Sequence, residues 1–249
     1  MRAKLGQNFL ADESVLQFEA ESAGVSGKSV LEIGAGDGRL TARLLSAGAG
    51  HITAVELDPK LAKSLRAKFR RKVKVVEGDF LDFPEPARFN VVVGNIPYYI
   101  TSPILLKLAR IDFDRAVLCV QKEVAGRMAA QPGTGGYGRL SVFSQLAFKT
   151  EILLAVGREA FSPAPKVDSC IVLLEKTGFV MPKKLDAIIG AIFSHRKKSL
   201  RNAVIDARGQ LGFADRASAG AAAQKLKYAG RKVFTLSPPE VLEAARQLG

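Results

Sequence analysis

The stretch Ser29-Val-Leu-Glu-Ile-Gly34-Ala-Gly36-Asp-Gly38-Arg39 joins a short β-rich run to a glycine-rich turn, and a helix-like segment follows at residues 40–47. Glycines directly after a strand let the backbone approach a ligand at the carboxyl edge of a parallel sheet. The dinucleotide fingerprint needs a further glycine where Arg39 stands, and the phosphate-binding loop needs Gly-Lys-Ser/Thr where this turn has Gly38-Arg39-Leu40. The stretch therefore predicts a strand, a turn and a helix that bind a ligand. It excludes both a dinucleotide fingerprint and a phosphate-binding loop.

Strand-like and helix-like segments alternate along the first part of the chain. Short β-rich runs bounded by Gly, Asp, Pro or charged residues occur at Ser29–Ile33, 52–57, 73–76, 89–93 and 116–120. Helix-like segments occur at 40–47, Pro59–Phe69 and 102–109. Pro59 stands at a first helical position, and apolar residues follow it at spacings of three and four. This order predicts an α/β fold with a parallel sheet covered on both faces, to which strands at 152–156 and 170–174 are added later.

The pattern changes near residue 178 of the 249 residues. The segment 177–184 contains Gly178 and Pro182 and is typical of a linker, and only helix-like segments rich in Ala and Leu follow it. We therefore expect two domains, an α/β domain over residues 1–178 and a small all-helical domain over residues 179–249. The glycine-rich segment 131–138 predicts a flexible loop that is a candidate lid.

The charge of the chain is unevenly distributed. The 37 Lys and Arg exceed the 24 Asp and Glu by 13, and residues 179–249 alone hold 13 basic and 5 acidic side chains, a net charge of +8. A concentrated positive field favours a polyanion, most simply nucleic acid. A generally basic surface that keeps the protein in solution is the alternative on charge alone.

Composition excludes several other classes of protein. Apolar runs such as 187–193 are far shorter than the ~20 residues that span a bilayer, and residues 1–10 lack the apolar core of a secretory signal. Cys119 and Cys170 lie in apolar strand-like runs, so buried reduced thiols are expected rather than a disulfide. Two histidines and no Cys-x-x-Cys argue against a metal site. We expect a cytoplasmic protein with no metal and no membrane association.

Acidic residues follow two further predicted strands. The second strand ends in Val55-Glu56-Leu57-Asp58, where a carboxylate can accept hydrogen bonds from both hydroxyls of a ribose. Asp79 ends the third, where a carboxylate suits the amino group of an adenine. One such acid is more often a solvated turn or a helix cap, but acids at successive strand ends favour a ligand site. The Glu-x-Gly-x-Gly-x-Gly stretch resembles motif I of Rossmann-like S-adenosylmethionine methyltransferases. The resemblance implies a cofactor site that includes Gly34, Gly36, Glu56, Leu57, Asp79 and Phe80.

The fourth strand leads into Asn95-Ile96-Pro97-Tyr98, which resembles the signature of amino-directed adenine and cytosine methyltransferases. An exocyclic amine is a poor nucleophile because its lone pair is delocalised into the ring, and two acceptors for its hydrogens favour the nucleophilic form. Asn95 can supply its side-chain oxygen, and Ile96 its backbone carbonyl, since the residue before Pro97 is held extended. Tyr98 can stack on an extruded base. The alternative is an ordinary strand-to-helix turn.

Several blocks together resemble the rRNA adenine N6-dimethyltransferase family over roughly residues 6–202. They are Gly6-Gln7-Asn8-Phe9-Leu10, the Gly34 turn, the Asn95 motif, and the blocks at 121–125, 137–142 and 161–169. The resemblance implies a methyltransferase domain with a mostly parallel seven-stranded sheet and a small helical C-terminal domain. It also implies that Asn8 and Leu10 join Asn95 around S-adenosylmethionine, and that Phe161 stacks on the target base opposite Tyr98.

Residues 193–202 and 231–240 resemble the branch that dimethylates two adjacent adenosines near the 3′ end of small-subunit rRNA, particularly its archaeal members. The implied partner is small-subunit rRNA within a pre-ribosomal subunit, bound by a monomer. The alternatives are the large-subunit enzyme of the macrolide-resistance type, a non-catalytic assembly factor with the same fold, and a DNA adenine methyltransferase. Tyr99 stands where some relatives have Asn.

A basic cluster in the C-terminal region is the predicted RNA contact. Its members are Arg196, Lys197, Lys198 and Arg201. Helical spacing would place Lys197 and Arg201 on one face, with Lys198 beside them, as a stripe suited to phosphates. A solvated helix face is the alternative.

Overall fold

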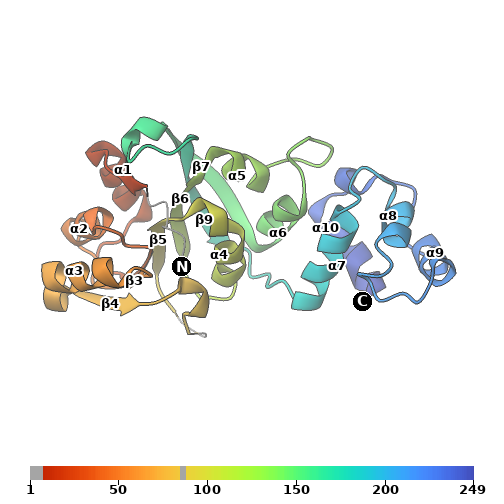
Figure 1. Cartoon of the computed structure of the whole chain (residues 1–249), viewed down its shortest axis with the longest axis horizontal. Helices are drawn as coiled ribbons and strands as arrows, with labels where there is room; N and C mark the ends of the chain where they lie inside the picture. Colours follow the sequence, from red (N-terminus) through yellow and green to blue (C-terminus); the bar gives the residue numbers. More distant parts are fainter. Residues whose placement is uncertain (1–7, 85–87) are drawn as a thin grey trace. The chain divides into compact units, whose positions relative to one another are not determined.

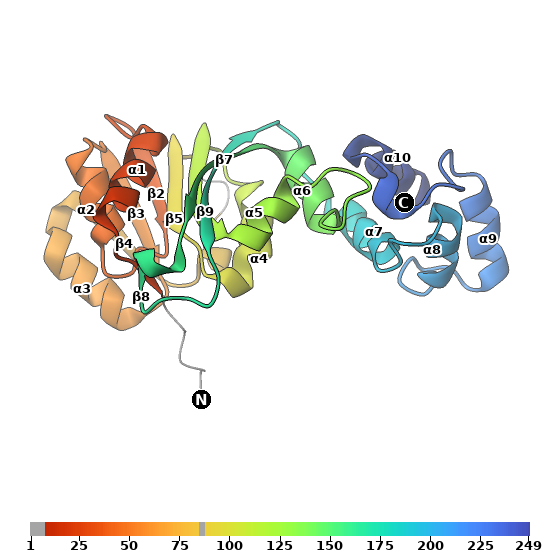
Figure 2. The same cartoon turned by 90° about the horizontal axis from the view of Figure 1, so that it is seen from above.

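The protein, in a computed structural model, is described over residues 8–84 and 88–249, so Gly6 and Gln7 of the N-terminal block lie outside the described residues. The chain forms two compact units, which Figures 1 and 2 show from two directions. The first consists of the chain up to Ala125 and of Thr150–Lys176, and the second of Gly126–Lys149 and Thr177–Gly249. Residues 126–149 thus group with the C-terminal helices, whereas a division at residue 178 would place them with the sheet.

The first unit is built on a seven-stranded sheet. Its strands are β2 Ser29–Ile33, β3 His51–Glu56, β4 Val73–Glu77, β5 Val91–Asn95, β6 Arg115–Gln121, β7 Phe148–Val156 and β9 Ser169–Lys176. Their order in the sheet is β4-β3-β2-β5-β6-β9-β7. The β2–β3, β3–β4, β2–β5 and β5–β6 pairs are parallel, and β9 is antiparallel to β6. The predicted α/β fold with a mostly parallel sheet is confirmed.

Helix α1 Glu13–Ala23 precedes the sheet, and α2 Arg39–Ser46, α3 Pro59–Phe69 and α4 Thr101–Leu108 connect its parallel strands. Short 3₁₀ helices are η1 Arg70–Lys72, η2 Phe80–Asp82, η3 Tyr98–Ile100 and η4 Arg158–Ala160. Helix α3 has the predicted bounds, because the Asp58 side chain accepts hydrogen bonds from the first backbone N–H groups and Pro59 occupies the first turn. Its face of Ala62, Leu65 and Phe69 is buried against the sheet.

The order of the strands determines where a ligand can bind. After β4 the chain returns to the other side of β2, so β2 and β5 are neighbours at which the direction of winding changes. Helices α1, α2 and α3 lie on one side of the sheet and α4 on the other (Figure 1). In open α/β sheets, a crevice forms at such a switch point, beyond the carboxyl ends of the strands.

A two-stranded ladder brings distant segments of this unit together. Strand β1 Phe9–Leu10 is antiparallel to β8 Phe161–Ser162, and Leu10 is directly opposite Phe161. The N–H groups of Ala11 and Asp12 both donate to the carbonyl of Ala160, at 2.7 and 3.1 Å. Residues 9–12 are therefore held beside the segment that carries Phe161.

The second unit is helical. It contains the end of α5 Lys122–Met128, α6 Arg139–Ala147, α7 Lys183–Phe193, α8 Leu200–Asp206, α9 Arg216–Gln224, η5 Val233–Thr235 and α10 Pro238–Leu248. Its buried apolar side chains include Ile192, Leu200, Val204 and Val241. The predicted helical C-terminal part is confirmed, although α7 begins inside the segment expected to be a linker.

The expected lid at 131–138 is wrong, because this loop is anchored within the helical unit. The Gly133 N–H donates to the carbonyl of Phe234 at 2.7 Å. The hydroxyl of the fully buried Tyr137 donates to the carbonyl of Leu236, also at 2.7 Å. Although residues 133–136 are exposed, the loop is anchored to its unit by these contacts rather than free to move as a lid.

The expected helical stripe of Lys197 and Arg201 is also wrong. Helix α7 ends at Phe193 and α8 begins at Leu200, so Lys197 lies in the turn between them. The Ser199 side chain caps α8 by accepting a hydrogen bond from the Asn202 N–H. Serine is a preferred residue at the N-terminal cap of a helix. The two basic residues therefore do not share one helix.

Cys119 and Cys170 are free thiols and both are buried, as expected. Among the described helices, none is long and apolar enough to span a membrane.

Candidate active site

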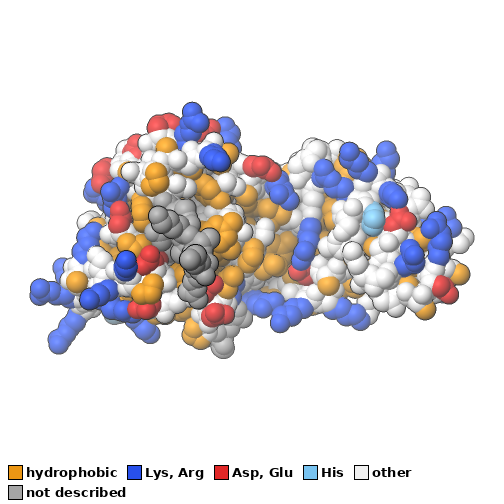
Figure 3. All heavy atoms as spheres, in the orientation of Figure 1, with side chains coloured by type: hydrophobic (Ala, Val, Ile, Leu, Met, Phe, Trp, Pro, Cys, Tyr) orange, Lys and Arg blue, Asp and Glu red, His pale blue; other side chains and the backbone are white. Residues whose placement is uncertain are grey.

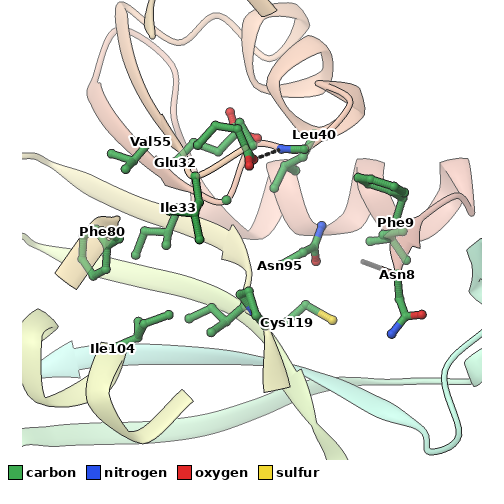
Figure 4. A pocket seen from close by; sticks show the side chains of 18 of the residues that line it. Asn8, Phe9, Glu32, Ile33, Leu40, Val55, Phe80, Asn95, Ile104 and Cys119 are labelled. Carbon is green, nitrogen blue, oxygen red and sulfur yellow. Dashed lines mark hydrogen bonds between the residues drawn. The ribbon is translucent and has the colours of Figure 1, made fainter. Parts of the chain in front are cut away.

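A pocket of about 270 Å³ opens at the carboxyl ends of the strands, where β2 and β5 meet (Figure 4). It is lined by every residue predicted for the cofactor and for the target base. These are Asn8, Leu10, Gly34, Gly36, Glu56, Leu57, Asp79, Phe80, Asn95, Ile96, Pro97, Tyr98 and Phe161. The structure therefore brings together side chains from positions 8 to 161 in one cavity of the first unit.

Asn95 is the last residue of β5 and lies opposite Cys119 of β6. The next residue, Ile96, is held by its N–H, which donates to the Cys119 carbonyl at 3.1 Å. The side-chain oxygen Oδ1 of Asn95 is buried and has no hydrogen-bond partner among the described residues. In Figure 4 the Asn95 amide lies between the side chains of Ile33 and Phe9. A buried acceptor without a partner is costly, which indicates that a donor from a ligand completes it.

Glu56 holds the glycine-rich turn in place. One carboxylate oxygen accepts from the Gly36 N–H and the other from the Asp58 N–H, each at 2.8 Å. Gly36 has φ of +57°, and a Cβ at this position would lie 3.0 Å from the ring of Phe9. Glycine is thus required both for the backbone conformation and for the width of the pocket. Each oxygen of the carboxylate keeps a second lone pair for a ligand hydroxyl.

Asp79 follows β4 and caps the short helix η2. Its side chain accepts from the Leu81 N–H at 2.9 Å, which directs the carboxylate to the pocket edge beside the buried Phe80. Asp79 is therefore a helix cap, as the alternative interpretation of the sequence expected. A capping carboxylate can still bind a ligand, because it has further acceptor sites.

Two aromatic side chains line the pocket from opposite parts of the chain. Tyr98 is half-buried, and its hydroxyl lies 2.7 Å from the hydroxyl of the fully buried Ser169. Burial raises the pKa of the Tyr98 phenol, so this group is neutral across the physiological range. Phe161 is 6% exposed and is held by the β1–β8 ladder. The Tyr98 ring is therefore held through its hydroxyl, and the Phe161 ring through its backbone.

Other residues that line the pocket were not predicted to do so. Phe9 and Cys119 are among them, as are Glu32 of the first motif and Tyr99 of the second. The alignment of β6 with β5 places Cys119 beside Asn95, and this alignment cannot be read from local sequence patterns. The sequence marks Tyr99 only as a residue that differs from the Asn of some relatives.

Two acidic side chains near the glycine-rich strand are buried, and one of them, Glu32, also lines the pocket. Glu19 of α1 and Glu32 of β2 are almost completely buried, and both carboxylate oxygens of Glu19 have no partner among the described residues. The Thr41 hydroxyl donates to one oxygen of Glu32 at 2.7 Å. Burial raises the pKa of each carboxyl to about 8, and the other acid adds to the effect at Glu19. Both groups are therefore largely protonated near neutral pH.

We expect this pair to make the protein less stable as the pH rises. An unfolded glutamate loses its proton near pH 4.5, whereas in the folded state both keep it to about pH 8. Between these values the folded state binds more protons, so the free energy of unfolding falls with rising pH. Denaturant titrations from pH 5 to 8 should show a shallower fall for Glu19→Gln than for the parent. Glu21→Gln, on the exposed face of the same helix, is the control. Equal slopes for all three proteins would contradict the expectation.

The four predicted RNA contacts lie in the helical unit and have unequal surroundings. The Arg196 guanidinium donates to the carbonyls of Tyr137 and Gly135, at 2.5 and 3.0 Å. Lys198 pairs with Asp206 at 2.5 Å. Lys197 and Arg201 are exposed. On the face shown in Figure 3, Lys and Arg side chains are spread over this unit with few acidic ones among them.

The fold and the pocket together define a Rossmann-like methyltransferase. The model of the ribosomal RNA adenine dimethylase family matches residues 1–227. The chain belongs to this family, and its cofactor is S-adenosylmethionine.

Individual relatives and solved structures agree with this. A probable ribosomal RNA small subunit methyltransferase A from Methanothermobacter thermautotrophicus is 41% identical over 100% of this chain and 91% of its own. One from Methanopyrus kandleri is 42% identical over 82% of this chain and 76% of its own. The structure of a dimethyladenosine transferase from Plasmodium falciparum has a TM-score of 0.80, with 27% identity over 95% of both chains. That of the 23S rRNA methyltransferase ErmE has a TM-score of 0.64, with 31% identity over 97% and 99%.

Proposed function

We propose that this enzyme transfers two methyl groups to N6 of each of two adjacent adenosines in the hairpin loop near the 3′ end of small-subunit rRNA. The support for the choice of RNA is the name of the relatives that are about 40% identical over most of the chain. The support for the reaction is one observation above all, the buried and unpartnered Oδ1 of Asn95 in the pocket.

The residues of the pocket fit S-adenosylmethionine. The Glu56 carboxylate would accept both ribose hydroxyls while it keeps the Gly36 turn in place. Asp79 would accept from the adenine amino group, with Leu57 and Phe80 beside the ring, and Gly34, Asn8 and Leu10 would complete the wall. The bound cofactor supplies a methyl group already activated by a sulfonium, so no covalent nucleophile is needed from the protein.

The Asn95 motif would bind the amine of the target base. Its Oδ1 and the carbonyl of Ile96 would accept the two N6 hydrogens, and Pro97 keeps Ile96 extended. Tyr98, oriented by its contact with Ser169, and Phe161 would stack on the two faces of an adenine extruded from the RNA. Catalysis then rests on positioning for in-line transfer and on polarisation of the amine.

Mapping the product tests this function. Small-subunit and large-subunit rRNA, each free and in partly assembled subunits, are incubated with the protein and labelled S-adenosylmethionine, and dimethyladenosine is located by sequencing and mass spectrometry. We expect two adjacent modified adenosines near the 3′ end of the small-subunit RNA. A single modified adenosine in large-subunit RNA would identify the resistance-type activity suggested by the likeness to ErmE. RNA binding without any transfer would favour an assembly factor.

We further propose that the helical unit binds RNA phosphates, and that the protein acts as a monomer in the cytoplasm on a pre-ribosomal small subunit. The net charge of +8 over residues 179–249 supports the first part. Lys197 and Arg201 are the better contacts, because Arg196 and Lys198 already bind groups of the protein. Sedimentation of the free protein would test the monomer.

Replacing Lys197 and Arg201 with Glu should weaken RNA binding and reduce its dependence on salt. Binding of a phosphate by a basic side chain releases counterions from the RNA, and a variant that lacks the contact releases fewer. The magnitude of the slope of log affinity against log salt concentration should therefore fall by ~0.7–0.9 per contact. Cofactor affinity should not change. The control is the same charge reversal at Lys60 and Lys63, which are exposed on α3. If the two double variants behave alike at every salt concentration, the helical unit does not dock the RNA.

A further inference from the structure

Tyr99 is a solvent-exposed aromatic residue. It is 65% exposed, and it is the one aromatic residue among the large apolar side chains that the structure describes as exposed. Within residues 8–84 and 88–249, its ring makes no ring contact and its hydroxyl makes no hydrogen bond. Folding therefore gains little from this ring, and an exposed aromatic at a pocket suggests an interaction with a partner.

The position of Tyr99 points to the kind of partner. It lines the pocket together with Pro97 and Tyr98 and lies in the 3₁₀ helix η3. The neighbouring Tyr98 is half-buried and bonded to Ser169. Of these two consecutive tyrosines, Tyr98 is therefore held within the pocket and Tyr99 is exposed at its rim.

An extruded adenine leaves the base next to it without its stacking neighbour. In single-stranded RNA such bases are commonly bound by aromatic side chains, because every base has a face that can stack. Tyr99 directly follows Tyr98, whose ring is proposed to hold the target adenine, and its exposed ring is available to a base next to that adenine.

We propose that Tyr99 is a positioning residue that stacks on the base adjacent to the target adenosine. This inference rests on the proposed function, since it requires an adenosine of single-stranded RNA in the pocket. Stacking needs only the ring, so the contact tolerates any neighbouring base and does not need the Tyr99 hydroxyl. Its effect is on the affinity and placement of the RNA, and not on the cofactor.

The test uses the full chain and a synthetic hairpin RNA with the 3′-terminal small-subunit loop. Tyr99→Ala should raise the KM for this RNA about five- to tenfold, with kcat, cofactor affinity and melting temperature close to the parent. Tyr99→Phe should behave as the parent. Ile152→Ala, which shortens another exposed apolar side chain that does not line the pocket, is the matched control and should have no effect.

A second set of RNAs tests the stacking itself. In two hairpins, the base on the 5′ or the 3′ side of the target adenosine is replaced by an abasic site. On one of them the parent and Tyr99→Ala should bind equally, because the base that Tyr99 contacts is missing. An equal difference between the two proteins on intact and on both abasic RNAs, or no difference on the intact RNA, would overturn the proposal. Lack of methylation of any rRNA by the parent protein would instead overturn the proposed function.

Discussion

Asn95→Ala is expected to lower the rate of methyl transfer about 10²–10³-fold, the usual cost of removing one preorganised hydrogen-bonding group that acts in the transition state. The variant should fold normally. Because the Asn95 Oδ1 is buried without a partner among the described residues, its removal leaves no broken hydrogen bond, and the free energy of unfolding should be unchanged or higher. The loss of rate would therefore come without a loss of stability.

Single-turnover transfer with saturating RNA and cofactor measures this effect, and thermal unfolding measures stability in parallel. Asn202→Ala is a suitable control, because this asparagine is exposed on α8 of the other unit. A variant at Asn95 that transfers methyl groups at nearly the parent rate would show that another group polarises the amine. A large loss of stability would show that the oxygen has a structural role.

Glu56→Ala is expected to weaken binding of S-adenosylmethionine by about 1.5–3 kcal/mol, or roughly 10- to 150-fold. Two effects add in this variant. The ribose hydroxyls would lose their charged acceptor, and the N–H groups of Gly36 and Asp58 would lose theirs. Glu56→Gln separates the two, since the amide keeps one acceptor oxygen, and should fall between the parent and Glu56→Ala.

Calorimetry with the cofactor alone measures the effect, and RNA binding without cofactor should be little changed. Glu77→Ala is the matched control. Glu77 lies directly opposite Glu56 in the next strand, but it is exposed and pairs with Arg66 at the surface, where such pairs contribute little. Equal cofactor affinity for Glu56→Ala and the parent would remove Glu56 from the cofactor site.

The sequence predicted most reliably what depends on neighbouring residues. The bounds of α3 follow from Asp58, Pro59 and an apolar face within eleven residues. The strand ends that carry Glu56 and Asn95 were also predicted, because parallel strands place their carboxyl ends at one edge. Motif spacing was therefore enough to identify most of the pocket.

What the sequence alone did not predict depends on distant contacts. The position of Phe161 beside Leu10 requires a ladder between segments about 150 residues apart. The family resemblance implied a role for each of the two residues at the site, but not this pairing. The loop 131–138 has the composition of a flexible segment, yet Tyr137 is fully buried and bonded to Leu236. The stripe of Lys197 and Arg201 failed because Ser199 starts a new helix between them. Likewise, nothing in α1 shows that Glu19 faces Glu32.

The short β1–β8 ladder couples two segments that line the pocket. Leu10 lies in one strand, with Asn8 just before that strand, and Phe161 lies in the other strand; backbone hydrogen bonds join the two segments. A substitution that loosens either strand releases the other as well, so the effects of changes in the N-terminal segment and in the loop before Phe161 will not add. In mutational terms, residues from opposite ends of this unit form a single epistatic group.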